Sequence, residues 1–307
     1  MKKNLLLFFT LFLISKYSFA LVDYTESSPE PAPAPTKIKR IAPPSSTNTS
    51  VASSSSLVSR SGPSGMFELA ANYGMIDAQV GDQSGKVNVT SFQAHFETSY
   101  NIWLDAAWSM GSFDSNSTIG EGSSQKGNPQ VILGVNWLEF GGGADRASMD
   151  FIGGANIGQK NSGFGTSRTD KIVGVETAKR FGTFVFGLGY RVWLTGNPSQ
   201  ESELSIGNIQ RLNASLGWMV SPDIRFAVEA ATVSIGSGEG DNALSEKISF
   251  GTVSPSLQLT ISPMVSLDLG AVFRSKRLKD ENLLNARLWN LPGSYGNKIY
   301  AGLNFSL

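Results

Sequence analysis

Apolar residues occupy every second position in twelve segments between residue 66 and residue 307. In one of them, Phe186, Leu188 and Tyr190 fall on one face, while Gly189 and Arg191 fall on the other. A period of two residues is typical of a β-strand, because successive side chains point to opposite faces of a sheet. The pattern predicts strands at about 66–76, 87–99, 102–113, 127–140, 147–158, 169–180, 183–195, 205–219, 224–236, 247–261, 264–275 and 295–307.

The connections between these segments are short and long in strict alternation. Short turns rich in Gly, Pro, Asn and Asp follow the even-numbered strands, for example Tyr100-Asn101 and Ser262-Pro263. Longer polar stretches follow the odd-numbered strands, at 77–86, 114–126, 159–168, 196–204, 237–246 and 276–294. This rhythm is typical of outer-membrane barrels, which have short periplasmic turns on one rim and long external loops on the other.

The two faces of the strands differ in a way that indicates lipid outside and charge inside. A soluble sandwich also alternates apolar and polar positions, so periodicity alone does not decide. Here the apolar face carries large aliphatic and aromatic side chains on nearly every strand, and the polar face carries charges. The predicted fold is therefore all-β, a transmembrane antiparallel up-and-down β-barrel of about twelve strands over residues 65–307.

The chain before the first strand has a different character. Lys2 and Lys3 precede a short apolar run, and small residues up to Ala20 complete the pattern of an export signal over residues 1–20. Residues 21–64 are rich in Pro and Ser and lack the apolar content needed to fold, so we predict a disordered periplasmic linker. A plain spacer and a tether to a periplasmic partner are both compatible with this composition.

The composition excludes several functions. Lys and Arg number 25 and Asp and Glu also number 25, so no basic surplus exists for a nucleic-acid partner. Cysteine is absent, and His95 is the only histidine, which excludes thiol catalysis and the usual zinc ligand sets. A serine-histidine site needs a serine nucleophile within reach of the histidine and a third group that orients the histidine. The residue two positions after His95 is Glu97 rather than a serine, so we interpret His95 as a hydrogen-bonded lumen residue. We predict no catalytic residue, no metal site and no cofactor.

The last eight residues, Tyr-Ala-Gly-Leu-Asn-Phe-Ser-Leu, resemble the terminal insertion signal of Gram-negative outer-membrane proteins. Tyr300, Gly302, Phe305 and Leu307 match its positions, although such proteins most often end in phenylalanine rather than leucine. The resemblance is to the broad porin-like class of Gram-negative outer-membrane barrels and covers residues 66–307. It implies location in the outer membrane, contact with membrane lipid, and recognition by the barrel-assembly machinery during insertion. The oligomeric state stays open.

Charged residues of inward parity carry the functional hypothesis. The lumen-lining candidates are Glu97, Asp105, Glu176, Arg191, Arg211, Arg225, Glu229 and Asp268, with Glu68 and Lys298 also inward. Acids dominate the first six strands and bases the last six, so we expect an acidic wall, with Glu97, Asp105 and Glu176, to face a basic one, with Arg191, Arg211 and Arg225. The predicted function is a narrow passive channel for small polar or charged solutes.

Two alternatives stay open at this stage. A closed structural barrel would use its long external loops to bind a partner or a surface, and a barrel enzyme would need a polar cluster around His95 or at the external rim. The stretch 276–294 bears on the first alternative, because it is unusually apolar for an external loop and also holds several bases. It is compatible with an amphipathic plug or lid, and equally with an extension of the flanking strands.

Overall fold

The computed structural model describes residues 66–98, 100–120, 122, 124–142, 145–160 and 162–307. The predicted export signal and the predicted linker both lie outside these residues. Twelve long strands form the fold: β1 (Met66–Val80), β2 (Gln83–Glu97), β3 (Ile102–Phe113), β5 (Gln130–Gly142), β6 (Asp145–Asn156), β7 (Asp170–Phe181), β8 (Phe184–Leu194), β9 (Ile209–Ser221), β10 (Ile224–Ile235), β11 (Ile248–Ser262), β12 (Val265–Arg274) and β13 (Gly296–Ser306). A two-residue strand, β4 (Gln125–Lys126), and one 3₁₀-helix, η1 (Glu281–Ala286), complete the described elements.

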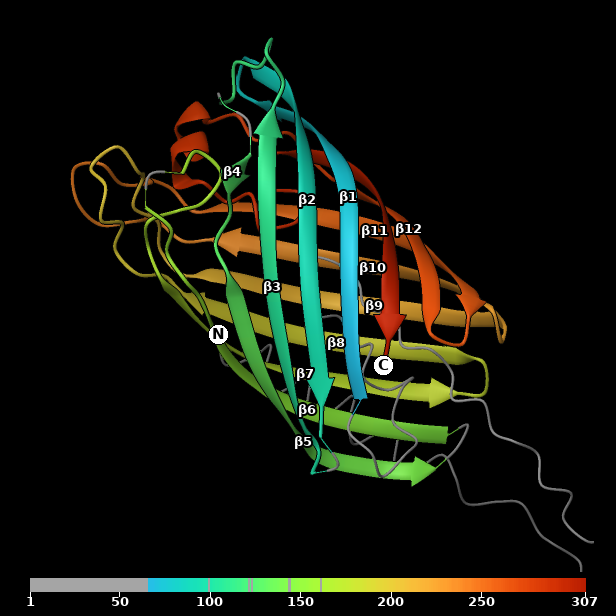
Figure 1. Cartoon of the computed structure of the whole chain (residues 1–307). Helices are drawn as coiled ribbons and strands as arrows, with labels where there is room; N and C mark the ends of the chain where they lie inside the picture. Colours follow the sequence, from blue (N-terminus) through green and yellow to red (C-terminus); the bar gives the residue numbers. More distant parts are fainter. Residues whose placement is uncertain (1–65, 99, 121, 123, 143–144, 161) are drawn as a thin grey trace, which may run out of the picture. The chain divides into compact units, whose positions relative to one another are not determined.

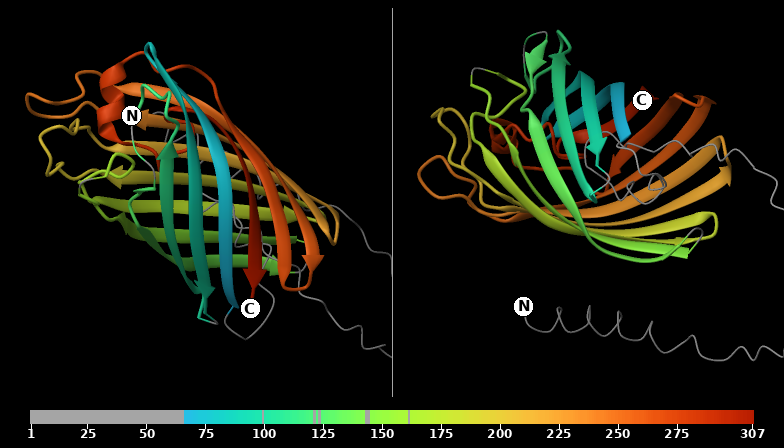
Figure 2. Two further views of the ribbon diagram at one scale, coloured as in Figure 1. Left: turned by 45° about the horizontal axis from the view of Figure 1, so that its top comes forward. Right: turned by 60° about the horizontal axis from the view of Figure 1, so that its bottom comes forward.

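The strands form a closed barrel (Figures 1 and 2). Each long strand pairs antiparallel with the next along the chain, and β1 closes the ring by pairing with β13 from Glu68 opposite Ser306 to Ala78 opposite Gly296. Closure matters because a lipid-facing sheet edge would leave backbone groups without partners. The predicted fold class is thus confirmed. No helix among the described residues is both long enough and apolar enough to cross a membrane.

The barrel has two different rims. The turn rim carries the short connections, such as Gly182-Thr183 and Pro222-Asp223 between neighbouring strands. The loop rim carries the long connections together with η1, which lies among them in Figure 1.

One connection was predicted wrongly. The stretch 77–86 was expected to be a long loop, but β1 and β2 continue to a two-residue turn at Gly81-Asp82, where Gly81 has a φ of +56°. The apolar residues Ala78 and Val80 near this turn face inward, while Asp77 and Gln79 face outward. Near this turn the apolar residues lie on the inner face and the polar residues on the outer face, which is the reverse of the pattern in lipid. A prediction that looks for outward apolar residues therefore ends these strands too early.

The outer surface is apolar over most of its height. Leu133, Leu212 and Leu216 are each about half exposed, although they belong to well-formed strands. Exposed aromatic rings gather near the turn rim, at Tyr100, Trp137, Phe140, Phe181, Phe184 and Trp218. Aromatic girdles of this kind occupy the headgroup zone of outer-membrane barrels. The predicted outward orientation of the apolar face is confirmed.

The inner surface divides into two zones along the barrel axis. Towards the turn rim it carries charged and amide side chains, including Glu68, Asp105 and Asp268. Towards the loop rim it carries apolar side chains, such as Val89, Ile172 and Val233, which belong to one buried cluster. The cluster continues into the segment between β12 and β13, so the loop end of the interior is filled by packed apolar groups.

Candidate functional site: the lid and the lumen

Residues 275–295, here called the lid, connect β12 to β13 and cover the loop end of the barrel interior. Leu283, Ala286 and Leu288 of the lid are buried in the apolar cluster. Of the two interpretations that the sequence left open for this stretch, the structure matches the lid.

The start of the lid is attached to the turn between β1 and β2. The amide of Gly81 donates to the carbonyl of Leu278 at 2.9 Å, and the amide of Asp82 donates to Oε1 of Glu281 at 2.6 Å. Arg277 donates to the carbonyl of Gly81 from the other side. These contacts explain why β1 and β2 extend so far: the hairpin is a support for the lid.

Trp289 is the centre of the lid's apolar core. Its ring stacks on Phe164 of the neighbouring loop at 5.6 Å and meets Phe113 of β3 edge-on at 5.4 Å. Tyr295 lies on its remaining side at 4.4 Å. Aromatic pairs in these geometries add about 0.5–1.5 kcal/mol each beyond the burial of their area. The four rings therefore link the lid to the wall and to a second loop.

The hydroxyl of Tyr295 holds the lid's chain in its folded course. It donates to the carbonyl of Leu283 at 2.6 Å and accepts from the amide of Leu288 at 2.8 Å. Both partners lie in the lid, on either side of the η1 C-terminus. Complete burial raises the pKa of Tyr295, because the phenolate would lose its hydration. The hydroxyl therefore stays protonated and remains a donor.

Two buried ion pairs tie the end of η1 to the loops around it, and we call them the latch. Arg168 bonds Asp170 at 3.0 Å and donates from Nη1 to the carbonyl of Ala286, also at 3.0 Å. Arg287 bonds Glu203 at 2.8 Å. Arg168, Asp170 and Glu203 are almost inaccessible to solvent, so removing one partner would leave a buried charge uncompensated.

Below the lid, the candidate lumen residues form ion pairs along the wall. Arg191 on β8 bonds Glu176 on the adjacent strand β7, with Nε 2.8 Å from Oε1. Arg211 on β9 bonds Glu229 on the adjacent strand β10 at 2.5 Å. The sequence placed Glu176 on a wall opposite Arg191 and Arg211. That arrangement is wrong, because the long side chains of Arg191 and Arg211 reach acids diagonally placed on adjacent strands, two residues along from the direct partner for Glu176 and four for Glu229.

A second group of candidates gathers near the turn rim. His95 and Asp105 are cross-strand partners, with Nδ1 2.5 Å from Oδ1, and Glu97 lies 4.0 Å from Nε2 of the same ring. Glu68 is the cross-strand partner of His95 on β1, but neither of its carboxylate oxygens has a hydrogen-bond partner in the described protein. The structure thus brings three carboxylates around one histidine.

Arg225 and Asp268 complete the set of candidates. Arg225 is close enough to Glu68 for the two charges to interact, although β10 and β1 are separated by three strands. Asp268 is buried on β12, and its Oδ2 has no protein partner in the part of the chain that the structure describes. Buried polar atoms in native proteins are paired with protein or water, so these groups indicate a solvated interior near the turn rim.

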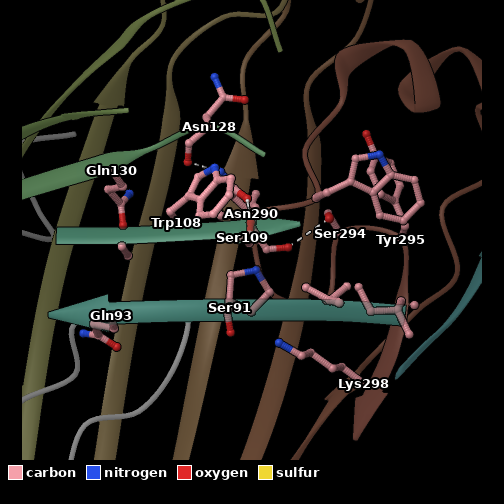
Figure 3. A pocket seen from close by; sticks show the side chains of 18 of the residues that line it. Ser91, Gln93, Trp108, Ser109, Asn128, Gln130, Asn290, Ser294, Tyr295 and Lys298 are labelled. Carbon is pink, nitrogen blue, oxygen red and sulfur yellow. Dashed lines mark hydrogen bonds between the residues drawn. The ribbon is translucent and has the colours of Figure 1, made fainter. Parts of the chain in front are cut away.

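A cavity of about 80 Å³ lies between the lid and the upper wall (Figure 3). Its lining includes Ser91, Gln93 and Ser109 from the strands, and Trp289 and Asn290 from the lid. Ser109 donates to Oδ1 of Asn290 at 3.0 Å, which Figure 3 shows as a dashed line. A second cavity of about 30 Å³ adjoins it, since both are lined by Asn128, Gln130, Asn290 and Leu291.

The closed antiparallel wall, the apolar exterior and the interior with charged and amide side chains define the fold of an outer-membrane β-barrel. Among solved structures, an outer-membrane channel from Pseudomonas putida F1 is similar with a TM-score of 0.57 and 9% identity, over 80% of this chain and 96% of its own. The NanC porin gives a TM-score of 0.49 and 14% identity, over 78% and 100% of the two chains. The translocator domain of the autotransporter NalP from Neisseria meningitidis gives 0.47 and 12%, over 82% and 91%.

At these identities the likeness concerns the fold alone, and only the first score exceeds 0.5. A comparison with protein-family models finds no match, and no curated protein is significantly similar.

The residues of the latch were not among the predicted site residues. Arg168, Glu203 and Arg287 lie in long polar connections, where charged residues are common and are usually solvated. Arg168 has a local ion-pair partner in Asp170, but its contact with Ala286 spans 118 residues and the pair of Arg287 with Glu203 spans 84, so the local pattern does not show that the three loops meet. Only the apolar content of the lid gave a signal that this rim is covered.

Proposed function

We propose that this chain is an outer-membrane channel for small polar or charged solutes and that the lid opens and closes its outer entrance. The observation that carries the proposal is the charged interior near the turn rim, enclosed by a wall whose outside is apolar. A barrel with a purely structural role gains nothing from burying both carboxylate oxygens of Glu68 and Oδ2 of Asp268 without hydrogen-bond partners among the described residues.

In this proposal, the solute crosses the barrel by passive diffusion past two ion pairs between adjacent strands, Glu176–Arg191 and Glu229–Arg211. Because each pair is neutral as a unit, the passage accepts both signs of charge and penalises apolar solutes. With the turn rim in the periplasm, as in barrels of this class, the lid covers the external side.

The contacts of the lid support movement of this segment. Several of its polar anchors reach other loops and the hairpin tip, as with Arg287 to Glu203 and Leu278 to Gly81, and Asn290 adds a hydrogen bond from Ser109 of the wall strand β3. Lids and loops belong to the parts of a protein whose local opening requires little free energy. Opening would expose the apolar core around Trp289, so the closed form is favoured at rest.

Planar-bilayer recordings of the full chain test the proposal. The wild type should show brief openings, and Arg287→Ala should lengthen them, because it removes the contacts of Arg287 with Glu203, Gln200 and the carbonyl of Ser162. Arg146→Ala is the matched control: it also removes an arginine from an ion pair, with Glu139, but at the turn rim. Open times equal to those of the wild type are expected for the control.

The alternative is a permanently closed structural barrel that uses its loops as a binding surface. The aromatic packing of Trp289 against Phe113, Phe164 and Tyr295 is the observation that favours it. A flat baseline from well-folded wild type and from Arg287→Ala alike would select this alternative and reject the channel.

A further inference from the structure

The larger cavity under the lid contains one charged group. Among the residues that line it, Lys298 of β13 is the only ionisable one other than Tyr295, and the rest are aromatic, aliphatic, amide or hydroxyl side chains. Figure 3 shows the ammonium directed into the space below Ser91. A lysine in such a place requires an explanation, because an ammonium inside a protein is costly unless it is paired.

Lys298 has no carboxylate partner in the part of the chain that the structure describes. Its neighbours on the two paired strands are Ile76 and Val272, which are both apolar and buried. Its one specific contact is with the ring of Tyr300, whose centroid lies 5.4 Å from Nζ. The position thus offers an ammonium with three N–H donors and no protein anion.

Several neutral polar groups of the cavity also lack hydrogen-bond partners among the described residues. Oγ of Ser91 is buried without a hydrogen-bond partner in the described protein, and the side chains of Gln93 and Gln130 make no hydrogen bond to described residues. These groups can donate to and accept from a small polar molecule. With about 80 Å³ of open space, the cavity has room for a molecule of a few heavy atoms.

The adjoining smaller cavity adds no excess of acid to the surroundings. Arg168, Arg191 and Arg287 line it, with Asp170 as its single acid. Each of these arginines is paired with an acid, so the positive charge of Lys298 is not offset by its surroundings, and it favours an anion over a cation.

We propose that the cavity under the lid binds a small organic carboxylate, held by an ion pair to Lys298 and by hydrogen bonds to Ser91, Gln93 and Gln130. The proposal rests on the proposed function in one respect, because the solute reaches the cavity through the lumen. It names the solute class that the channel would retain: short anionic molecules of about three carbons. Trp289 and Asn290 of the lid form the roof of this site, so an occupant contacts the lid directly.

The test is an equilibrium titration of the full chain, folded in detergent micelles, with sodium lactate and with glycerol. Both probes have three carbons, and only lactate carries a charge. Binding is followed by tryptophan fluorescence, since Trp108 and Trp289 line the cavity. We expect a saturable change with lactate and none with glycerol. Lys298→Met should weaken lactate binding at least about tenfold, and Lys298→Arg should retain most of it.

Lys171→Met is the matched control, because Lys171 is an exposed lysine on the outer face of β7. Equal responses to lactate and glycerol, or unchanged lactate affinity in Lys298→Met, would overturn the proposal. The comparison of the two probes on wild-type protein decides the matter even where Lys298→Met does not fold. Because the titration needs no ion current, a barrel that binds lactate but does not conduct would reject the channel and keep the site.

Discussion

Arg191 on β8 and Arg211 on β9 are direct cross-strand partners, and the barrel encloses both side chains almost completely. Like charges in this position destabilise a sheet. Glu176 on the strand before and Glu229 on the strand after neutralise them, so four neighbouring strands carry a row of acid, base, base and acid. The row fixes the guanidinium groups against the wall, which keeps them from crossing the lumen.

The row predicts a large cost for removing one of its acids. Glu229→Gln leaves Arg211 without its ion pair, and we expect about 3 kcal/mol of lost stability, because a buried charge loses its partner. The double variant Arg211→Met/Glu229→Met should lose much less, since both charges leave together. Urea titration of the barrel in lipid vesicles, followed by tryptophan fluorescence, measures both. Equal losses in the single and double variants would show that the pair is solvated and independent.

The outer surface predicts a cost that depends on depth. Leu216 is half exposed near the middle of β9, and Leu216→Arg should destabilise the barrel in vesicles by about 2–4 kcal/mol. Met264 is exposed in the turn between β11 and β12, and Met264→Arg should cost about 0–1 kcal/mol. The same urea titration compares them. If the two substitutions cost the same, the middle of the wall does not face lipid.

The seam between β1 and β13 gives a prediction about Gly302, which also belongs to the predicted assembly signal. A methyl group on Gly302 would lie 1.8 Å from Oδ1 of Asn72, so Gly302→Ala should destabilise the barrel by about 1–3 kcal/mol. Asn72→Ala in the same chain removes that oxygen and should restore part of the loss in refolded protein, while the carbonyl oxygen of Ala71, 2.8 Å from the methyl group, remains. Stability is measured by urea titration, and assembly is measured separately in cells.

This pair of readouts separates two roles of Gly302. Rescue by Asn72→Ala in refolded protein but not in cells would indicate that the assembly machinery recognises the glycine itself. Rescue in both would indicate a packing role alone. Absence of rescue in refolded protein would contradict the contact on which the prediction is based.

The sequence predicts the wall well because lipid imposes a simple rule on it. Leu188 and Tyr190 face outward and Gly189 and Arg191 inward, as the alternation requires, and only the position of strand ends differs by a few residues. The rule fails where the barrel leaves the lipid. Ala78 and Val80 face inward against the lid, so the apolar face of β1 changes sides along one strand.

The interior is less predictable for a different reason. The alternation identifies Glu176 and Arg211 as residues that face the lumen. It does not indicate whether such a side chain bonds a residue on an adjacent strand or one on the opposite wall. That choice depends on register and side-chain length, and the register of β7 against β8 brings Glu176 within reach of Arg191. Contacts such as Arg168 to Ala286 join residues far apart in sequence and leave no local pattern.

The central claim, that the lid gates a channel, is tested most directly by locking it. The chain has no cysteine, and Val80 and Leu278 form an isolated β-bridge with both side chains buried. Val80→Cys/Leu278→Cys therefore introduces a single disulfide between the hairpin and the lid. In planar bilayers we expect the oxidised protein to be silent and the same channels to open on adding a thiol reductant. Equal conductance before and after reduction would contradict gating by the lid.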